Sequence, residues 1–173
     1  DRRKLEELSR RCRRAGLTNV QALCLEDSWT RDGGAGRLPA WLTARGADRV
    51  LGDAPCSGLG VLRCNPEARW RLRPGDLDEL PATQLRLLTA AATLVRPHGR
   101  LIYATCTVLR RENEEVVARF LASHPHYAPV PIKEILGAAR VRGCSDGDGV
   151  YLRTLPTLEG PDGFFAAVLR SIG

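Results

Sequence analysis

VLGDAPCSG at residues 50–58 is an apolar run that ends abruptly in small and reactive residues, and RLIYATCT at residues 100–107 has the same form. Such runs are typical of buried strands in a parallel sheet. Ligands of an open α/β sheet bind outside the carboxyl ends of its strands. The two stretches therefore predict that Asp53, Cys56 and Cys106 surround one substrate.

Working outward from these stretches, apolar periodicity and turn residues divide the rest of the chain into helices and strands. Helical spacing predicts helices over residues 2–15, 76–95 and 112–123. Short apolar runs predict strands over residues 19–25, 49–53, 100–104, 150–155 and 164–169. Residues 57–75 form a long connection, and connections of this length in a compact domain are usually functional or disordered. This order of elements predicts an α/β sheet that ends in an antiparallel strand pair.

Length and charge limit the classes of protein to consider. The 173 residues suit one domain with its own core. The net charge of +6 favours an acidic partner such as nucleic acid. The basic face of the helix at residues 2–15 is either simply solvated or binds RNA, and both readings stay open. No apolar run approaches the roughly 20 residues of a membrane span, so we expect no membrane partner.

The six cysteines show neither a metal-binding pattern nor the density of a disulfide scaffold. We therefore expect no metal, reduced thiols and a cytoplasmic protein. Cys12 and Cys24 lie on apolar faces and are predicted to fill core space. Cys106 ends a strand shortly before a helix, a setting that depresses a thiol pKa and favours a nucleophile. Asp53, at another strand end, can hold or accept a proton.

Five segments carry a resemblance to a known family. They are DAPCSGLG at 53–60, RCNPEARWRL at 63–72, YATCT at 103–107, ENEEVVARFL at 112–121 and DGFFAAVL at 162–169. With these segments in this order, the chain resembles the catalytic domain of the RNA cytosine-C5 methyltransferases. That family includes bacterial 16S rRNA 5-methylcytosine enzymes and the NOL1/NOP2/Sun proteins. The resemblance implies a Rossmann-like methyltransferase sheet, S-adenosylmethionine as cofactor, and RNA, specifically ribosomal RNA, as the partner.

The resemblance also implies a role for each site residue. Cys106 would attack cytosine C6, which activates C5 toward methylation. Cys56 would take part in release of the C5 proton, and Asp53 would stabilise the covalent adduct near cytosine N3. Asp27, Asp53 and Pro55 would lie against the methyl donor.

The long connection supplies the candidate RNA contacts. Arg69, Arg71 and Arg73 are predicted to bind RNA because they lie in the loop beside the cleft. Trp70 and Trp41 either stack on bases, as in many readers of single-stranded RNA, or pack within the protein.

Two alternatives to these roles stay open. In DNA cytosine methyltransferases the cysteine after proline is the nucleophile, so Cys56 would attack and Cys106 would be structural. The YATCT and DGFF segments argue against that assignment. The other alternative is that both cysteines merely fill space at strand ends.

One departure from the family concerns the donor site. Neither the first strand of the family nor its glycine-rich donor loop is found in residues 1–173. The resemblance therefore implies a single, partial, N-terminally truncated catalytic domain. Either an upstream segment completes the sheet, or the sheet closes up without it. The second functional hypothesis is accordingly a truncated, inactive, RNA-binding fragment.

Overall fold

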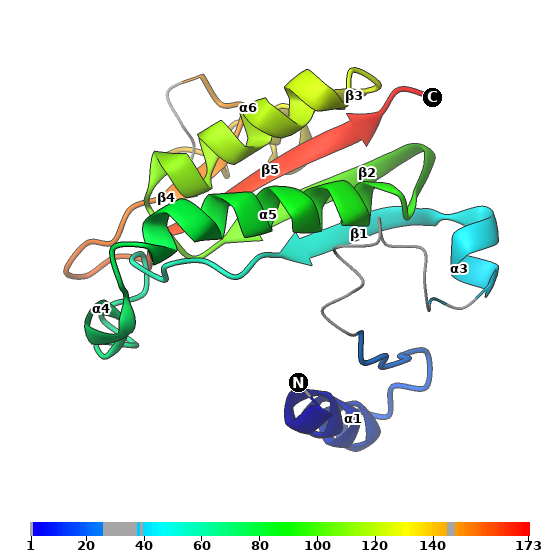
Figure 1. The fold of residues 1–173 in the computed structure, drawn as a ribbon, viewed down its shortest axis with the longest axis horizontal. Helices are drawn as coiled ribbons and strands as arrows, with labels where there is room; N and C mark the ends of the chain where they lie inside the picture. Colours follow the sequence, from blue (N-terminus) through cyan, green and yellow to red (C-terminus); the bar gives the residue numbers. More distant parts are fainter. Residues whose placement is uncertain (1, 26–37, 39, 145–147) are drawn as a thin grey trace.

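The computed structural model describes residues 2–25, 38, 40–144 and 148–173 (Figure 1). Its helices are α1 (Arg2–Arg14), α3 (Ala40–Arg45), α4 (Ala68–Arg71), α5 (Asp76–Ala92), α6 (Glu114–Ser123) and α7 (Ile132–Leu136), with a 3₁₀ turn η1 (Arg110–Glu112). Its strands are β1 (Ala47–Asp53), β2 (Val95–Thr105), β3 (Tyr127–Pro129), β4 (Leu152–Thr154) and β5 (Phe164–Ser171). The architecture is the predicted α/β sheet.

The five strands form one mixed sheet in the order β1-β2-β5-β3, with β4 also pairing with β5. β1 and β2 are parallel, and α5 connects them across one face. β5 runs antiparallel to β2, β3 and β4, which confirms the predicted antiparallel pair at the end of the chain. Because β1 and β2 are parallel neighbours, their carboxyl ends meet at the same end of the sheet.

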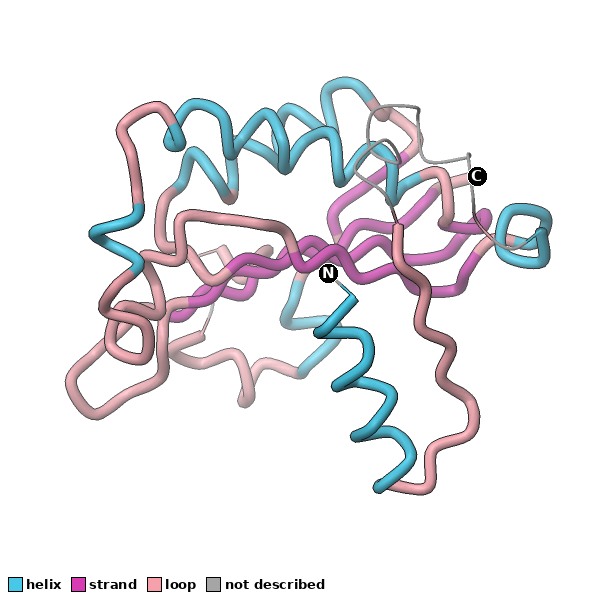
Figure 2. Tube along the Cα trace, turned by 60° about the horizontal axis from the view of Figure 1, so that its bottom comes forward, coloured by secondary structure: helices cyan, strands magenta, loops and turns pink. Residues whose placement is uncertain are grey.

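The main core lies between the sheet and the helices α5 and α6, which cover one face (Figures 1 and 2). Leu101 and Tyr103 of β2 and Phe165 of β5 point to this face and pack against Leu88 of α5 and Phe120 of α6. The alternation of strand side chains sends the intervening residues to the other face. A smaller apolar cluster there joins Val168 of β5 to the segment around α7.

The predicted strand over residues 19–25 is wrong. The structure has no strand there; residues 17–25 are an exposed extended segment that runs back beside α1, apart from the sheet (Figure 2). A parallel strand forms only beside a partner that takes up its backbone hydrogen bonds, and no strand of the described part offers one. Cys24 is consequently exposed rather than a core filler, whereas Cys12 is buried as predicted.

β1 forms one edge of the described sheet, with β2 as its only partner there. Leu51, in the middle of β1, is 66% exposed on the face opposite α5. The described residues therefore leave this edge open. Among the described helices, none combines the length and apolar character that a membrane crossing requires.

Candidate active site

Two thiols meet at the carboxyl ends of the parallel strands β1 and β2. The last residue of β1, Asp53, pairs with Ala104 of β2, and the amide of Ala54 continues the ladder to the Ala104 carbonyl. Cys56 and Cys106 follow these positions, and their Sγ atoms lie 3.4 Å apart, within hydrogen-bond distance. Both side chains are half-buried. Strand register thus brings together two residues that are far apart in the sequence.

The surroundings of Cys56 favour its neutral thiol. Burial, and after it the hydrogen bond with Cys106, raise the pKa of Cys56 from 9.0 to about 12. A thiol with so high a pKa carries almost no negative charge near neutral pH. Cys56 is therefore suited to donate a hydrogen bond to a neighbouring thiolate rather than to be the thiolate itself.

The other predicted site residues have distinct surroundings. Asp53 is exposed at the carboxyl end of β1. Pro55 is exposed as well, and its carbonyl accepts a hydrogen bond of 2.9 Å from Nε2 of Gln84 in α5. Asp27 lies outside the described residues. The structure thus brings Asp53 and Pro55 to the same end of the sheet as the cysteine pair.

A buried polar network beneath the cysteines was not foreseen from the sequence. The Glu112 side chain is fully buried and contacts Ser57, Gln84 and Thr107. The Thr107 and Ser57 hydroxyls also lie 2.8 Å apart. The sequence does hold a signal, because a hydroxyl residue directly follows each of the two cysteines.

Two glycines anchor the loop that carries Cys56. The amide of Gly60 donates to the Cys106 carbonyl at 3.0 Å, and the amide of Gly163 donates to the Gly60 carbonyl at 2.8 Å. A Cβ on Gly60 would lie 2.1 Å from the Gly163 carbonyl oxygen, so only glycine fits. This contact explains in physical terms why glycines occur in both the DAPCSGLG and DGFF segments.

Arg63 joins the long connection to the turn before β5. Its guanidinium donates to the carbonyls of Thr157, Leu158 and Gly160 and to the carboxylate of Asp162. The long connection is thus held near its start, although the segment between β1 and α4 contains no helix or strand.

The candidate RNA-binding arginines lie on and after α4, beyond the carboxyl ends of the strands (Figure 1). All three are exposed. The Arg69 guanidinium lies over the ring of Trp70, 4.9 Å from its centroid, and Arg71 pairs with Glu67. Trp70 is 79% exposed, so the alternative that it packs within the protein is wrong. The side chain of Trp41 is not among those described.

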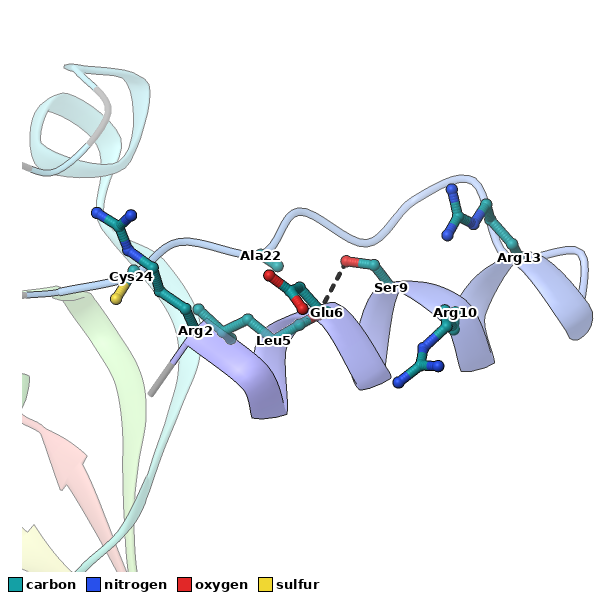
Figure 3. A pocket seen from close by; sticks show the side chains of 8 residues that line it. All are labelled: Arg2, Leu5, Glu6, Ser9, Arg10, Arg13, Ala22 and Cys24. Carbon is teal, nitrogen blue, oxygen red and sulfur yellow. Dashed lines mark hydrogen bonds between the residues drawn. The ribbon is translucent and has the colours of Figure 1, made fainter.

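An open cavity of about 770 Å³ lies elsewhere, between α1 and the segment before residue 25 (Figure 3). Its lining residues are Arg2, Leu5, Glu6, Ser9, Arg10, Arg13, Ala22 and Cys24. None of the predicted site residues is among them, so this cavity is separate from the cysteine pair. Nowhere in the described ranges do histidine, cysteine and carboxylate side chains form a group that could hold a metal ion.

Comparisons with known proteins found a matching family model and similar chains. The family model described as 16S rRNA methyltransferase RsmB/F matches residues 1–170. The ribosomal RNA small subunit methyltransferase B of Thermus thermophilus is 40% identical over 126 residues, which are 73% of this chain and 30% of that protein. The enzyme of the same name from Sodalis glossinidius is 39% identical over 135 residues, 78% of this chain and 28% of that protein. The chain therefore matches less than a third of the length of these relatives.

A solved structure shares the fold. The structure of NSun6 from Pyrococcus horikoshii with SFG superposes with a TM-score of 0.75 at 24% identity. The match covers 100% of this chain and 40% of that one. The chain thus has the fold of part of that structure.

Proposed function

The chain belongs to the family of 16S rRNA methyltransferases RsmB/F, and from this premise we propose that it carries the catalytic cysteines of an RNA cytosine-C5 methyltransferase acting on ribosomal RNA. The observation that carries this proposal is the 3.4 Å approach of the Cys56 and Cys106 sulfur atoms at the ends of β1 and β2. Two thiols at this distance suit a reaction that needs one nucleophile and one proton carrier.

Cys106 is the nucleophile in this proposal. Its thiolate attacks C6 of the cytosine, the electron pair of the C5–C6 double bond forms a C4–C5 double bond, and the pair of the C4–N3 double bond moves onto N3, which takes up a proton. C5 is then the nucleophilic carbon of an enamine and can accept a methyl group. The raised pKa of Cys56 supports this assignment, because Cys56 stays protonated and its thiol can donate to the Cys106 sulfur. Asp53 lies beside the pair and would stabilise the adduct by sharing a proton with N3.

Cys56 acts after the methyl group has been transferred. Burial, the larger cause of the raised pKa of Cys56, persists once the Cys106 sulfur is bonded to carbon, whereas the hydrogen bond with Cys106 is weakened. The Cys56 thiol therefore passes its own proton to solvent water first and then, as a thiolate, accepts the proton from C5. The C5–C6 double bond forms again, and Cys106 leaves as a thiolate.

The methyl donor proposed is S-adenosylmethionine, which supplies an electrophilic methyl group when bound. Asp53 is exposed at the end of an edge strand, where a ligand can approach it, and the residues present fit a donor beside the cysteines. Asp53, Pro55 and, from the resemblance, Asp27 would hold it.

The target cytosine must leave its base stack to reach Cys106. Arg69 and Trp70 lie at the same end of the molecule and present a cation and an aromatic ring to solvent. Exposed aromatic rings beside arginines suit unstacked bases. We therefore assign the RNA contacts to α4 and its surroundings, including Arg71 and Arg73.

Two cysteine variants test the assignment. Cys106→Ala should abolish methyl transfer to ribosomal RNA, because no nucleophile remains. Cys56→Ala should accumulate a protein–RNA adduct that survives denaturation, because the adduct forms but cannot resolve. Transfer of a labelled methyl group and gel mobility under denaturing conditions measure the two outcomes.

Cys144→Ala is the matched control, because Cys144 is half-buried as well but lies outside the pair. This variant should methylate RNA at the wild-type rate. An adduct formed by Cys106→Ala but not by Cys56→Ala would instead support the nucleophile assignment of the DNA enzymes.

The second candidate function is an inactive RNA-binding fragment. The edge of β1 that the described residues leave without a partner strand favours it. Calorimetric titration of S-adenosylmethionine into the folded chain distinguishes the two functions. Binding at about micromolar strength, roughly 8 kcal/mol, supports a donor site formed by this chain. Absence of S-adenosylmethionine binding by the folded chain supports RNA binding without methyl transfer.

A further inference from the structure

Glu112, the last residue of η1, carries a carboxylate with no access to solvent. Oε2 accepts hydrogen bonds from the Ser57 amide at 2.9 Å and from Nε2 of Gln84 at 2.9 Å. Oε1 accepts from the hydroxyls of Ser57 at 2.6 Å and Thr107 at 3.2 Å. None of the ion pairs found among the described residues includes Glu112. Hydrogen bonds alone therefore accommodate this buried group.

The donors to Glu112 come from both loops that carry the cysteines. Ser57 is bonded covalently to Cys56, and Thr107 is bonded covalently to Cys106. The Glu112 carboxylate thus binds the residue that follows each of the two cysteines. It thereby connects two strand ends that are far apart in the sequence. Hydrogen bonds to an ionised acceptor are short and roughly twice as strong as neutral ones, which suits them to fixing a distance.

Gln84 extends the same network to the backbone before Cys56. Its Nε2 donates both to Glu112 and to the carbonyl of Pro55, each at 2.9 Å. Both peptide groups that flank Cys56 are therefore held. Gln84 binds the carbonyl of the peptide before Cys56, and Glu112 binds the amide of the peptide after it. A contribution to stability alone would not require contacts on both sides of one cysteine and on the neighbour of the other.

We propose that Glu112 is a positioning residue that sets the distance between the Cys56 and Cys106 sulfur atoms. It touches neither sulfur and acts through Ser57 and Thr107. Any effect of this distance on catalysis rests on the proposed function. The effect of Glu112 on the distance does not. Loss of the carboxylate leaves the buried Ser57 amide without a partner, and the loop carrying Cys56 must then shift to satisfy it.

Phenylarsine oxide is the probe, because its arsenic binds two thiols only where their sulfur atoms lie close together. Two As–S bonds form, and the arsenic-bound oxygen leaves as water with the two thiol protons, so no oxidant or reductant is consumed. Calorimetric titration of the full chain measures the affinity, and a Cys56→Ser variant identifies the signal from the pair. We expect Glu112→Leu to weaken binding by about tenfold or more, with Glu112→Gln between it and the wild type.

Tyr127→Phe is the control for a purely structural effect. It removes another buried hydrogen bond, from the Tyr127 hydroxyl to the Ala92 carbonyl, far from the pair. It should lower thermal stability and leave the affinity within about twofold. A folded Glu112→Leu chain with wild-type affinity would overturn the proposal. If Glu112→Leu does not fold, Ser57→Ala decides in its place: weaker binding supports the proposal and unchanged binding overturns it.

This experiment uses neither RNA nor a methyl donor, so its result is independent of the proposed function. Weakened arsenical binding in a chain whose Cys106→Ala variant still methylates RNA would leave Glu112 as a positioning residue and refute the cysteine mechanism. Unchanged arsenical binding in Glu112→Leu, together with loss of methylation in Cys106→Ala, would refute the positioning role and leave the cysteine mechanism in place.

Discussion

The sulfur atoms of Cys56 and Cys106 are neighbours of the same chemical type, and we propose different roles for them. Cys56 follows an exposed proline, yet burial and the contact with Cys106 raise its pKa to about 12. The folded chain therefore keeps this proton where an unfolded chain loses it. The resulting contribution to stability is fully present below the thiol's ordinary pKa of 9.0 and is lost as the pH rises through about 12.

At this scale we predict a change in thiol reactivity. Cys106→Ala removes the hydrogen bond that raises the pKa of Cys56, so the pH midpoint for alkylation of Cys56 by iodoacetamide should move down. It should stay above the ordinary value, because burial, the larger cause, persists. Mass spectrometry of the peptide containing Cys56 gives the rate at each pH. Cys144→Ala should leave the midpoint in place, and an upward shift in Cys106→Ala would refute this account.

Among the elements, α5 does most to place the site. It connects β1 to β2 as a parallel crossover, packs Leu88 into the core, and extends Gln84 toward the Pro55 carbonyl. The loop between β1 and α4 has no such regular structure. It depends instead on the contact of Gly60 with Gly163, which joins it to the turn before β5.

The element-scale prediction concerns that glycine contact. Gly60→Ala places a methyl group 2.1 Å from the Gly163 carbonyl oxygen, and such overpacking costs about 1–3 kcal/mol of unfolding free energy. Gly75→Ala is the control, because Gly75 has helical backbone angles and open space around it. Its effect should stay within about 0.5 kcal/mol. Urea unfolding measures both, and equal midpoints for the two variants would contradict the prediction.

For the molecule as a whole, the relevant feature is the edge of β1 that the described residues leave without a partner strand. An unpaired strand edge with apolar residues readily pairs with another chain. Leu51, in the middle of β1, presents an apolar side chain beside this edge and is 66% exposed.

The prediction at this scale is self-association through β1. Leu51→Lys should shift the chain toward monomers in sedimentation velocity over a concentration series, because charge on an edge strand opposes pairing. Leu158→Lys is the control, since Leu158 is 98% exposed but lies in a loop. If Leu158→Lys shifts the chain toward monomers equally well, the association is caused by exposed apolar side chains in general and not by the strand edge.

Much of the fold could be predicted from local pattern. The helix over residues 2–15, the helix from Asp76 and the strands around Asp53 and Thr105 were all expected, because periodicity and turn residues are local signals. The helix predicted over 112–123 begins at Glu114, after the turn η1. Short elements such as β3 and α7 were not expected, because their proline-rich sequence has no clear period.

The failure at residues 19–25 has a different cause. That segment has the composition of a strand, yet a strand requires a neighbour, and composition says nothing about whether one is present. The same holds for Cys24, whose apolar surroundings in sequence do not become burial without a sheet to pack on.

The sequence by itself determined the family, the positions of the two cysteines at strand ends and the antiparallel close of the sheet, because each depends on a few adjacent residues. Tertiary structure alone decided the 3.4 Å distance between the sulfur atoms, the high pKa of Cys56 and the role of Glu112. These depend on strand register and burial, which bring together residues that the chain holds far apart. A buried carboxylate in particular has no local signature, since its four hydrogen bonds exist only once three separate segments have packed.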